Sequence, residues 1–368
     1  MSTDECQSRP RRIAFFSDSA YPTINGVSVS VASLMEEFHR RGILVDLYSP
    51  ADFPCLSFKG VSIPLALPCS RRAARRFREN LPDVVHIHTP FGAGIAGLAW
   101  AKKHGIPVVY SHHTHYPHFV DYVTPGFRAL ASFVCRTWLN IFLKRSKAVI
   151  TPTAASEKWL QEFGFKDRIN VVPTGTNWTK IAHSPEVNNY KTVLCVGRLA
   201  HEKNLDIVIK AFSQLDQSRY QLTFVGDGPL RSELTYLCTG LNVQFLGELN
   251  HLEMEEIYAR ADALAFAADR DTQGLVVNEA LAAGLPIAVV QGGGADCFIQ
   301  PGITGYAAKR DDFFTALSSA LTLPKHSGDS SKSIQDCASR ILDLYFHTGT
   351  LQEIESKTSK VASPVLFR

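Results

Sequence analysis

The sequence predicts an α/β protein of two domains, each a mostly parallel sheet covered on both faces by helices. Two observations lead to this prediction. The chain has 368 residues, more than one typical hydrophobic core organises. Short β-branched runs alternate with helix-length segments along the whole chain, and these runs are nearly continuously apolar, as in strands buried on both faces.

The elements can be placed along the chain by their patterns. The clearest helical periodicity lies at residues 27–41, 204–215 and 252–260. The expected strands lie at residues 12–18, 43–50, 83–90, 106–114, 148–153, 169–174, 191–199, 220–228, 243–249, 261–268 and 285–293.

The domain boundary is expected in the polar segment "GTNWTKIAHSPEVNNYK", residues 175–191, which lacks periodicity. We therefore expect an N-terminal Rossmann-like domain at 1–180, a C-terminal Rossmann-like domain at 181–345 and a polar tail at 346–368.

Composition indicates a cytosolic protein. The chain is 45% hydrophobic and 20% charged, and its net charge of +3 does not predict a nucleic-acid partner. The apolar run "FGAGIAGLAWA" is shorter than the roughly 18 residues that a membrane span needs. The N-terminus shows no apolar signal segment, and the 8 cysteines form no CxxC pair, which favours reduced thiols.

The stretch "DRDTQGLVVNEALAAGLP" predicts a ligand site. Gly274 opens an expected helix, whose N-terminal amides suit a phosphate. Asp271 precedes that helix and Glu279 lies on it, and carboxylates accept hydrogen bonds from hydroxyl groups. A nucleotide-diphosphate sugar would satisfy both acids and the amides. Alternatively, Asp271 caps the helix and Glu279 is a surface residue.

A second stretch, "VGRLAHEKN", supports the same kind of ligand. Arg198 and Lys203 follow an expected strand, at the sheet edge where open α/β sheets bind ligands. Two cations at this edge would neutralise a diphosphate. The alternative is a solvated pair of loop charges.

These stretches, with "VGDGPLR", "VQFLGEL", "NGVSVSVASLMEEFHRRG", "DVVHIHTPFGAG" and "YSHHTHYPHFVDYV", resemble family 4 retaining glycosyltransferases of GT-B fold. The resemblance covers the chain to about residue 320. It implies that the donor, a UDP- or GDP-sugar, is bound by Gly26, Arg198, Lys203, Asp271, Thr272, Gln273, Gly274, Leu275 and Glu279. It also implies an active-site histidine at His113, followed by Thr114. No cofactor or metal is expected.

The resemblance also implies a mechanism. No covalent nucleophile has a fixed place in these motifs, so front-side attack by the acceptor hydroxyl is expected, with the leaving diphosphate taking its proton. His113, Asp271, Arg198 and Lys203 would then act by positioning and charge stabilisation. Two departures stand out: the family often has glutamate where this chain has Asp271, and "QGGGADCF" replaces its GGxPE motif.

Other motifs receive different interpretations. "GAGIAG", residues 92–97, matches GxGxxG but follows a later strand, and no acid lies on the next strand, so close helix–strand packing is favoured over nicotinamide binding. "HHTHYPH" with Asp121 raises a metal hypothesis that the ligand spacing does not favour. "DRD" is not interpreted as a metal motif. His86 and His88 are expected to be structural.

The segment "SRRAARRFREN" is strongly basic. Its default interpretation is a solvated helix face; the alternative is contact of Arg71, Arg72, Arg75 and Arg76 with anionic lipid. Lipid acceptors are frequent in the family, and "TQGLV" resembles its diacylglycerol branch.

The leading hypothesis is therefore hexose transfer to a lipid or membrane-linked acceptor by a cytoplasmic protein peripherally bound to the inner face of the membrane. A soluble sugar, inositol or natural-product acceptor is the alternative within the same class. A nucleotide-sugar epimerase and a non-catalytic nucleotide-sugar binder are the alternatives from other classes. The base, the sugar and the oligomeric state do not follow from the sequence.

Overall fold

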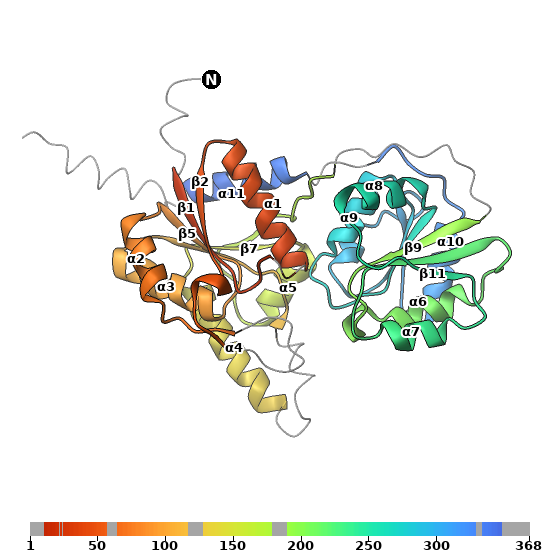
Figure 1. Cartoon of the computed structure of the whole chain (residues 1–368), viewed down its shortest axis with the longest axis horizontal. Coiled ribbons are helices and arrows are strands. Elements are labelled where there is room, and N and C mark those ends of the chain that lie inside the picture. The colour runs from red at the N-terminus through yellow and green to blue at the C-terminus, as the bar shows by residue number, and fades with distance from the viewer. Residues whose placement is uncertain are drawn as a thin grey trace, which may run out of the picture. The chain divides into compact units, whose positions relative to one another are not determined.

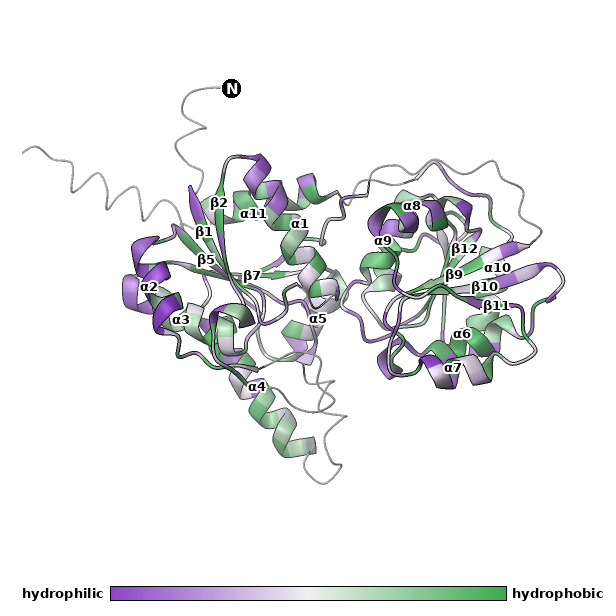
Figure 2. Ribbon diagram, in the orientation of Figure 1, coloured by the Kyte–Doolittle hydropathy of each residue, from purple (hydrophilic) through white to green (hydrophobic). Residues whose placement is uncertain are grey.

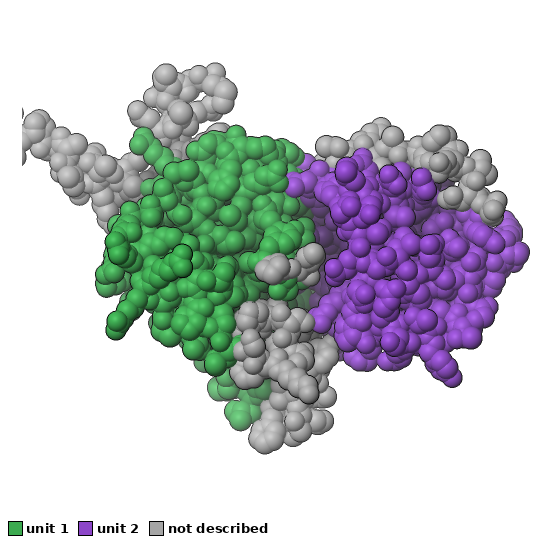
Figure 3. All heavy atoms as spheres, in the orientation of Figure 1, with its two compact units in different colours: residues 1–152, 156–175, 334–368 green, residues 153–155, 176–333 purple. Residues whose placement is uncertain are grey.

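The computed structural model describes residues 11–21, 23, 25–56, 65–116, 128–178, 190–328 and 333–347. The chain divides into two compact units, coloured in Figure 3. Unit 1 comprises Met1–Pro152, Ser156–Gly175 and Ile334–Arg368; unit 2 comprises Thr153–Ala155 and Thr176–Ser333. The C-terminal segment therefore returns to unit 1 after the whole of unit 2 has been built.

Unit 1 contains a six-stranded sheet of order β2-β1-β5-β6-β7-β8, in which every neighbouring pair is parallel. Residues of β5, β6 and β7 are buried throughout, which accounts for their unbroken apolar sequences. The strands are β1 (Arg12–Phe16), β2 (Leu44–Tyr48), β5 (Val84–Ile87), β6 (Val108–Ser111), β7 (Ala148–Thr151) and β8 (Ile169–Val171). A short antiparallel pair, β3 (Cys55–Leu56) and β4 (Leu65–Ala66), follows β2 in the sequence.

Helices cover both faces of this sheet (Figure 1). One core cluster joins the sheet to α2 (Arg71–Glu79), α3 (Gly92–His104), α4 (Arg128–Arg145) and α5 (Ala154–Glu162). The opposite cluster joins it to α1 (Gly26–Arg40) and α11 (Ile334–His347). The prediction of a parallel sheet covered on both faces is confirmed.

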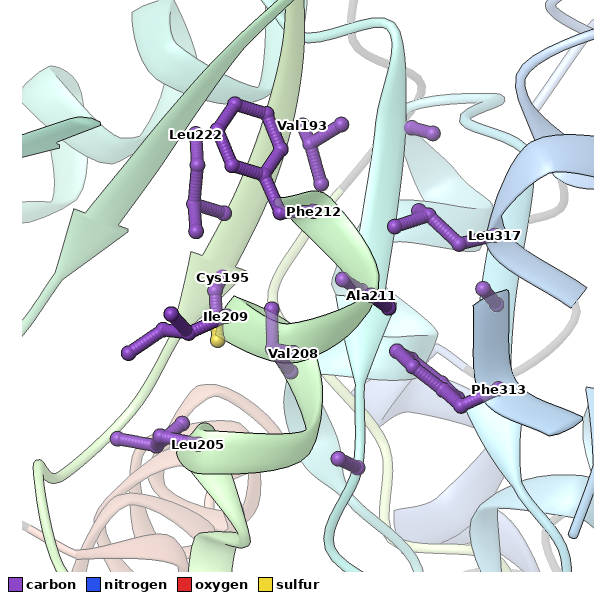
Figure 4. Packing of buried hydrophobic residues seen from close by; sticks show 14 of the residues in the cluster. Val193, Cys195, Leu205, Val208, Ile209, Ala211, Phe212, Leu222, Phe313 and Leu317 are labelled. Carbon is purple, nitrogen blue, oxygen red and sulfur yellow. The ribbon is translucent and has the colours of Figure 1, made fainter. Parts of the chain in front are cut away.

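Unit 2 repeats the design, with order β11-β10-β9-β12-β13-β14 and parallel pairing throughout. Its strands are β9 (Lys191–Val196), β10 (Tyr220–Val225), β11 (Val243–Phe245), β12 (Ala263–Phe266), β13 (Ile287–Val290) and β14 (Gly305–Ala308). On one face lie α6 (Leu205–Phe212), α7 (Arg231–Leu237) and α10 (Phe313–Ala320). On the other lie α8 (His251–Arg260) and α9 (Leu275–Ala282). Figure 4 shows Phe212, Leu222 and Phe313 in the first of these cores.

The structure differs from the sequence expectation in the place of α11 and in strands β3, β4 and β14, which were not expected. The boundary at residue 345 placed residues 334–345 in the second domain, whereas α11 packs on α1 in unit 1, with Ala338 and Tyr345 completely buried. Strand β14 was also not expected. Its sequence, GYAA, lacks β-branched residues, and a Cβ on Gly305 would lie 1.9 Å from the carbonyl oxygen of Ile287.

The glycines of "GAGIAG" serve packing at the start of α3, as expected. A Cβ on Gly94 would lie 2.0 Å from the carbonyl oxygen of Thr89, and one on Gly97 would lie 2.6 Å from the ring of Phe16. The amide of Ala93 also donates to the buried carboxylate of Asp18 at 2.9 Å. This N-terminal amide is therefore satisfied within the fold.

Candidate active site

The first part of the candidate site lies at the carboxyl ends of β9 and β12, which are neighbours in the unit 2 sheet. After β9 the chain turns through Gly197 into a short 3₁₀ helix, η4 (His201–Lys203). Lys203 Nζ donates to Asp271 Oδ2 at 2.6 Å, and both side chains are about a quarter exposed, at 23% and 25%. Lys203 and Asp271, two of the residues predicted to bind the donor, are therefore in contact with each other and partly open to solvent.

Asp269, the other acid of "DRD", has a structural role. Its Oδ1 accepts from Asn204 Nδ2 at 3.0 Å, and its Oδ2 accepts from Arg310 Nε at 2.7 Å. Asn204 adopts a left-handed backbone conformation with φ 48° and also donates to the carbonyl oxygen of Ala267 at 2.9 Å. Asn204 and Arg310 thus hold the loop that carries Asp271. Asparagine tolerates this conformation, a usable sequence signal, whereas nothing in the sequence marks Arg310.

The unusual "QGGGAD" segment supports the same loop. The amide of Gly294 donates to the carbonyl oxygen of Asp271 at 2.7 Å, and a Cβ at Gly294 would lie 1.7 Å from the carbonyl oxygen of Thr272. A Cβ at Gly293 would approach the carbonyl oxygen of Ala268 to 3.0 Å. Glycines here let the two loops pack backbone to backbone, so this departure from the family motif builds a closely packed wall.

Gly274 and α9 provide the expected helix N-terminus. Gly274 has φ 76°, and a Cβ there would lie 2.8 Å from Phe266 Cζ, so both backbone conformation and space require glycine. Helix α9 begins at the next residue, Leu275, while Thr272 and Gln273 form the approach to it. The four residues predicted to offer amides to a phosphate therefore lie at one helix start.

Glu279 is held in a defined position on α9. Its Oε2 accepts a hydrogen bond from the Tyr258 hydroxyl at 2.7 Å. Burial raises the pKa of Glu279, while hydrogen bonds from Tyr258 and Trp178 and the charge of His251 act in the opposite direction. Trp178 stacks on the His251 ring with centroids 4.2 Å apart. Glu279 is thus a partly buried residue that its neighbours hold in place. The sequence did not predict these aromatic neighbours of Glu279, because Trp178 comes from the linker and Tyr258 and His251 come from α8.

Arg198 lies on the loop after β9, whose backbone is fixed. The amide of Leu199 donates to the carbonyl oxygen of Asp227 at 3.0 Å, and a Cβ at Gly226 would lie 2.2 Å from the carbonyl oxygen of Gly197. The side chain of Arg198 is exposed. The glycines of "VGDG" thus let the loops after β9 and β10 pack together and present Arg198 at the sheet edge.

His113 in unit 1 follows β6 and lies in a row of histidines. Its Nε2 is 3.0 Å from Nδ1 of His88, whose ring stacks on that of His86. His86 in turn bonds Ser111 Oγ at 2.7 Å and the hydroxyl of Tyr345 on α11 at 2.6 Å. Burial lowers the pKa of His113 to about 4, so its imidazole is neutral at pH 7. His86 is structural as expected, whereas His88 touches the predicted active-site histidine directly.

Gly26 is the first residue of α1 and is exposed. The preceding Asn25 caps this helix, since its Oδ1 accepts from the amides of Val27 and Ser28, both at 3.0 Å. Ser28 Oγ accepts from the amide of Asn25 at 2.9 Å and completes a capping box. The cap therefore fixes the backbone around Gly26 within unit 1.

The basic segment forms α2, and its arginines divide into two groups. Arg71, Arg72 and Arg75 are exposed, and Arg75 pairs with Glu79 at 2.7 Å. Arg76 turns inward: it pairs with Asp52 at 2.8 Å and lies over the Tyr48 ring at 4.1 Å from the centroid. Arg76 therefore also anchors α2 to β2 and the following turn, while contact of this helix with lipid stays a prediction.

In the part of the chain that the structure describes, no cluster of three or more histidine, cysteine or acidic residues is arranged to hold a metal ion. His118 and Asp121, which belonged to the metal hypothesis, lie outside the described residues. Over those same ranges, no helix has both the length and the apolar character for crossing a membrane.

Two α/β units, each with a six-stranded parallel sheet, are the architecture of the GT-B class of glycosyltransferases. The family model "Glycosyltransferase Family 4" matches residues 24–179, and "Glycosyl transferases group 1" matches residues 176–335. The chain belongs to glycosyltransferase family 4.

Similar proteins agree with this assignment. The chain is 28% identical to the alpha-monoglucosyldiacylglycerol synthase of Streptococcus pneumoniae, over 75% of this chain and 70% of that protein. It is 28% identical to a sulfoquinovosyl transferase of Arabidopsis thaliana, over 87% of this chain and 68% of the relative. Its fold matches HepE of Anabaena, solved with UDP and glucose, with TM-score 0.65 and 17% identity, covering 95% and 99% of the two chains.

Proposed function

We propose that this protein transfers a hexose from a UDP- or GDP-sugar to a hydroxyl of a lipid or membrane-linked acceptor, with retention of the anomeric configuration and without a metal. The observation that carries the proposal is the contact between Lys203 and Asp271 at the carboxyl edge of the unit 2 sheet, just before helix α9, on which Tyr258 holds Glu279. The pneumococcal relative is named as a synthase of monoglucosyldiacylglycerol, and this name supports a lipid acceptor.

The donor would lie along this edge. Glu279, held by Tyr258, would accept hydrogen bonds from the ribose hydroxyls. Arg198 and Lys203 would neutralise the diphosphate, together with the backbone amides of Thr272 to Leu275. Asp271 would bind hydroxyls of the transferred sugar. In unit 1, the loop at Gly26 would contribute a further contact to the donor.

The chemistry follows from these positions. The acceptor hydroxyl would attack the anomeric carbon on the face from which the diphosphate leaves. The carbon–oxygen bond to phosphate would break as the new glycosidic bond forms, and the acceptor proton would pass to the departing diphosphate. The protein would stabilise the leaving group by charge and by fixed amide dipoles. His113 is neutral at pH 7, so it would orient a hydroxyl group without donating a full positive charge.

The proposal is tested first by nucleotide binding. Thermal stability would be measured with UDP, GDP, ADP and NAD on wild type, Glu279→Ala and Arg198→Ala. A ligand at about 100 times its Kd stabilises by roughly 2.7 kcal/mol. One nucleoside diphosphate should stabilise the wild type and much less either variant. Stabilisation by NAD alone, or by none of the four, would reject a nucleotide-sugar site.

The second test is turnover of the sugar nucleotide that the first test selects. Release of nucleoside diphosphate should require a diacylglycerol-type acceptor dispersed in detergent, proceed in EDTA and give the α-anomer by NMR from an α-linked donor. Turnover only with soluble sugars or inositol would favour the other acceptor class. Conversion of donor without acceptor would indicate an epimerase, and binding without turnover a non-catalytic sensor. A cytoplasmic, peripherally membrane-bound location is part of the same proposal.

A further inference from the structure

Helix α4 presents an apolar face to solvent. Its C-terminal half packs on the sheet through buried Leu139, Phe142 and Leu143. Its N-terminal half extends away from the sheet, where Figure 2 shows apolar colour along the helix. Leu130, Phe133 and Val134 are 61%, 66% and 57% exposed.

The three exposed side chains form one stripe. Positions i, i+3 and i+4 lie on the same side of an α-helix, so Leu130, Phe133 and Val134 face solvent together. Single exposed apolar residues are ordinary, but three large ones in one stripe are typical of an interaction surface. The sequence did not reveal this face, because α4 carries apolar residues on several sides.

The charge of α4 indicates which partner covers the stripe. The helix sequence RALASFVCRTWLNIFLKR contains four basic residues and no acidic one. Arg136, one turn from Phe133, is exposed, with its guanidinium 4.6 Å from the centroid of the Phe163 ring. Lys144 and Arg145 at the end of the helix are exposed as well. An apolar stripe on an exclusively basic helix fits the interface of an anionic lipid bilayer, which offers apolar chains beside negative headgroups.

We propose that α4 inserts its outer half into the surface of anionic membranes through Leu130, Phe133 and Val134. The inference deepens the proposed function and rests on its lipid acceptor for its biological purpose, but it stands on separate residues. The N-terminal half of α4 would lie in the headgroup region, as an interfacial helix does, while its C-terminal half stays packed on the sheet. The exposed arginines Arg71, Arg72 and Arg75 on α2 of the same unit add attraction for anionic lipid without being the inserting element.

The test is co-sedimentation of the full chain with sucrose-loaded vesicles of phosphatidylcholine, with and without 30% phosphatidylglycerol. The triple variant Leu130→Ser, Phe133→Ser, Val134→Ser should bind anionic vesicles about 100-fold more weakly, because three apolar side chains no longer enter lipid. The matched control is Tyr236→Ser with Leu252→Ser, two side chains of unit 2 that are 79% and 73% exposed. It should bind like the wild type.

Insertion itself is measured with Phe133→Trp, which keeps an aromatic side chain. Its fluorescence should shift to shorter wavelength and be quenched by brominated lipid, relative to the wild type. Equal vesicle binding by the wild type and the triple variant would overturn the proposal. So would equal binding to neutral and anionic vesicles, or a dimer in solution that only the triple variant dissociates, since the stripe would then serve a second copy.

Two parallel measurements separate this inference from the proposed function. Stabilisation by nucleotide reports the donor site in unit 2, and transfer in detergent reports chemistry without a bilayer. Vesicle binding that depends on α4 in a protein that transfers nothing would support the inference and reject the function. Transfer in detergent by a protein whose vesicle binding does not depend on α4 would support the function and reject the inference.

Discussion

The substitution Glu279→Gln separates a ligand-binding role of this residue from a structural one. It removes a negative charge while keeping the length and shape of the side chain. The amide oxygen of glutamine can still accept the hydrogen bond that Tyr258 donates to Glu279 Oε2 at 2.7 Å. The local packing of α8 and α9 should therefore survive the change.

Glu279→Gln is expected to change stability and nucleotide binding in opposite directions. Burial raises the pKa of Glu279 above its usual range, so the ionised carboxylate costs folding free energy. That cost appears as pH rises above the unfolded value of about 4.3 and is complete above the folded value. Glu279→Gln should thus be as stable as wild type at pH 4 and equal or up to about 1 kcal/mol more stable at pH 7.

Binding of the nucleotide should weaken instead. A hydrogen bond to a charged acceptor contributes about 1.5–3 kcal/mol, against about 0.5–1.5 kcal/mol for a neutral one. Two ribose hydroxyls bound by a neutral amide would lose about 2 kcal/mol in total, which is roughly 30-fold in Kd. Calorimetric titration with UDP and GDP measures this loss, and urea unfolding at pH 4 and 7 measures stability.

The matched control is Tyr258→Phe, which keeps the carboxylate and removes the hydrogen-bond donor. It should lower stability by about 1–2 kcal/mol, because the buried carboxylate loses a partner, and weaken nucleotide binding less than Glu279→Gln does. The reasoning is refuted if Glu279→Gln binds nucleotide like the wild type while losing stability, since Glu279 would then be a structural residue.

Three other predictions concern unit 1. Arg76→Ala should lower the free energy of unfolding by about 1–3 kcal/mol through its lost contacts with Asp52 and Tyr48, whereas Arg72→Ala should stay within about 0.5 kcal/mol in the same urea titration. Gly97→Ala should cost about 1–3 kcal/mol, because its methyl group would lie 2.6 Å from the Phe16 ring; a thermal melt like that of the wild type would contradict this. The lowered pKa of His113, about 4, makes protonation favour unfolding, so wild-type stability should fall between pH 6.5 and 4 more steeply than that of His113→Gln.

The fold could be predicted where burial on both faces controls the sequence. Strands such as β5 and β12 consist of buried residues throughout, so their apolar runs are unambiguous. Strand β14 could not be recognised because close approach to β13 requires a glycine at its start. The place of α11 could not be recognised either. Its amphipathic pattern indicates that one face of the helix is buried, but it does not indicate which of the two units the face packs against.

The site could be predicted where a residue's own chemistry identifies it. Lys203 and Asp271 carry charges at the ends of adjacent strands, and the structure brings them into contact. Supporting residues such as Trp178 and Arg310 could not be predicted, because their partners Glu279 and Asp269 are distant in sequence and tryptophan and arginine occur in many settings. The exposed stripe of α4 could not be predicted for a related reason. Its exposure depends on how far the helix extends beyond the sheet, which the sequence does not state.

The two acids of "DRD" differ in how firmly the structure holds them. Asp269 is 18% exposed and accepts from two partners, Asn204 and Arg310, so exchanging its bonds for those of a ligand would dismantle the loop. Asp271 has one ion pair, to Lys203, open to solvent and therefore worth about 1 kcal/mol or less. In the proposed function, a nucleotide-sugar would replace that pair at little cost, because its diphosphate would bind Lys203 and its sugar hydroxyls would bind Asp271. The acid with the weaker attachment is thus the one suited to bind the donor.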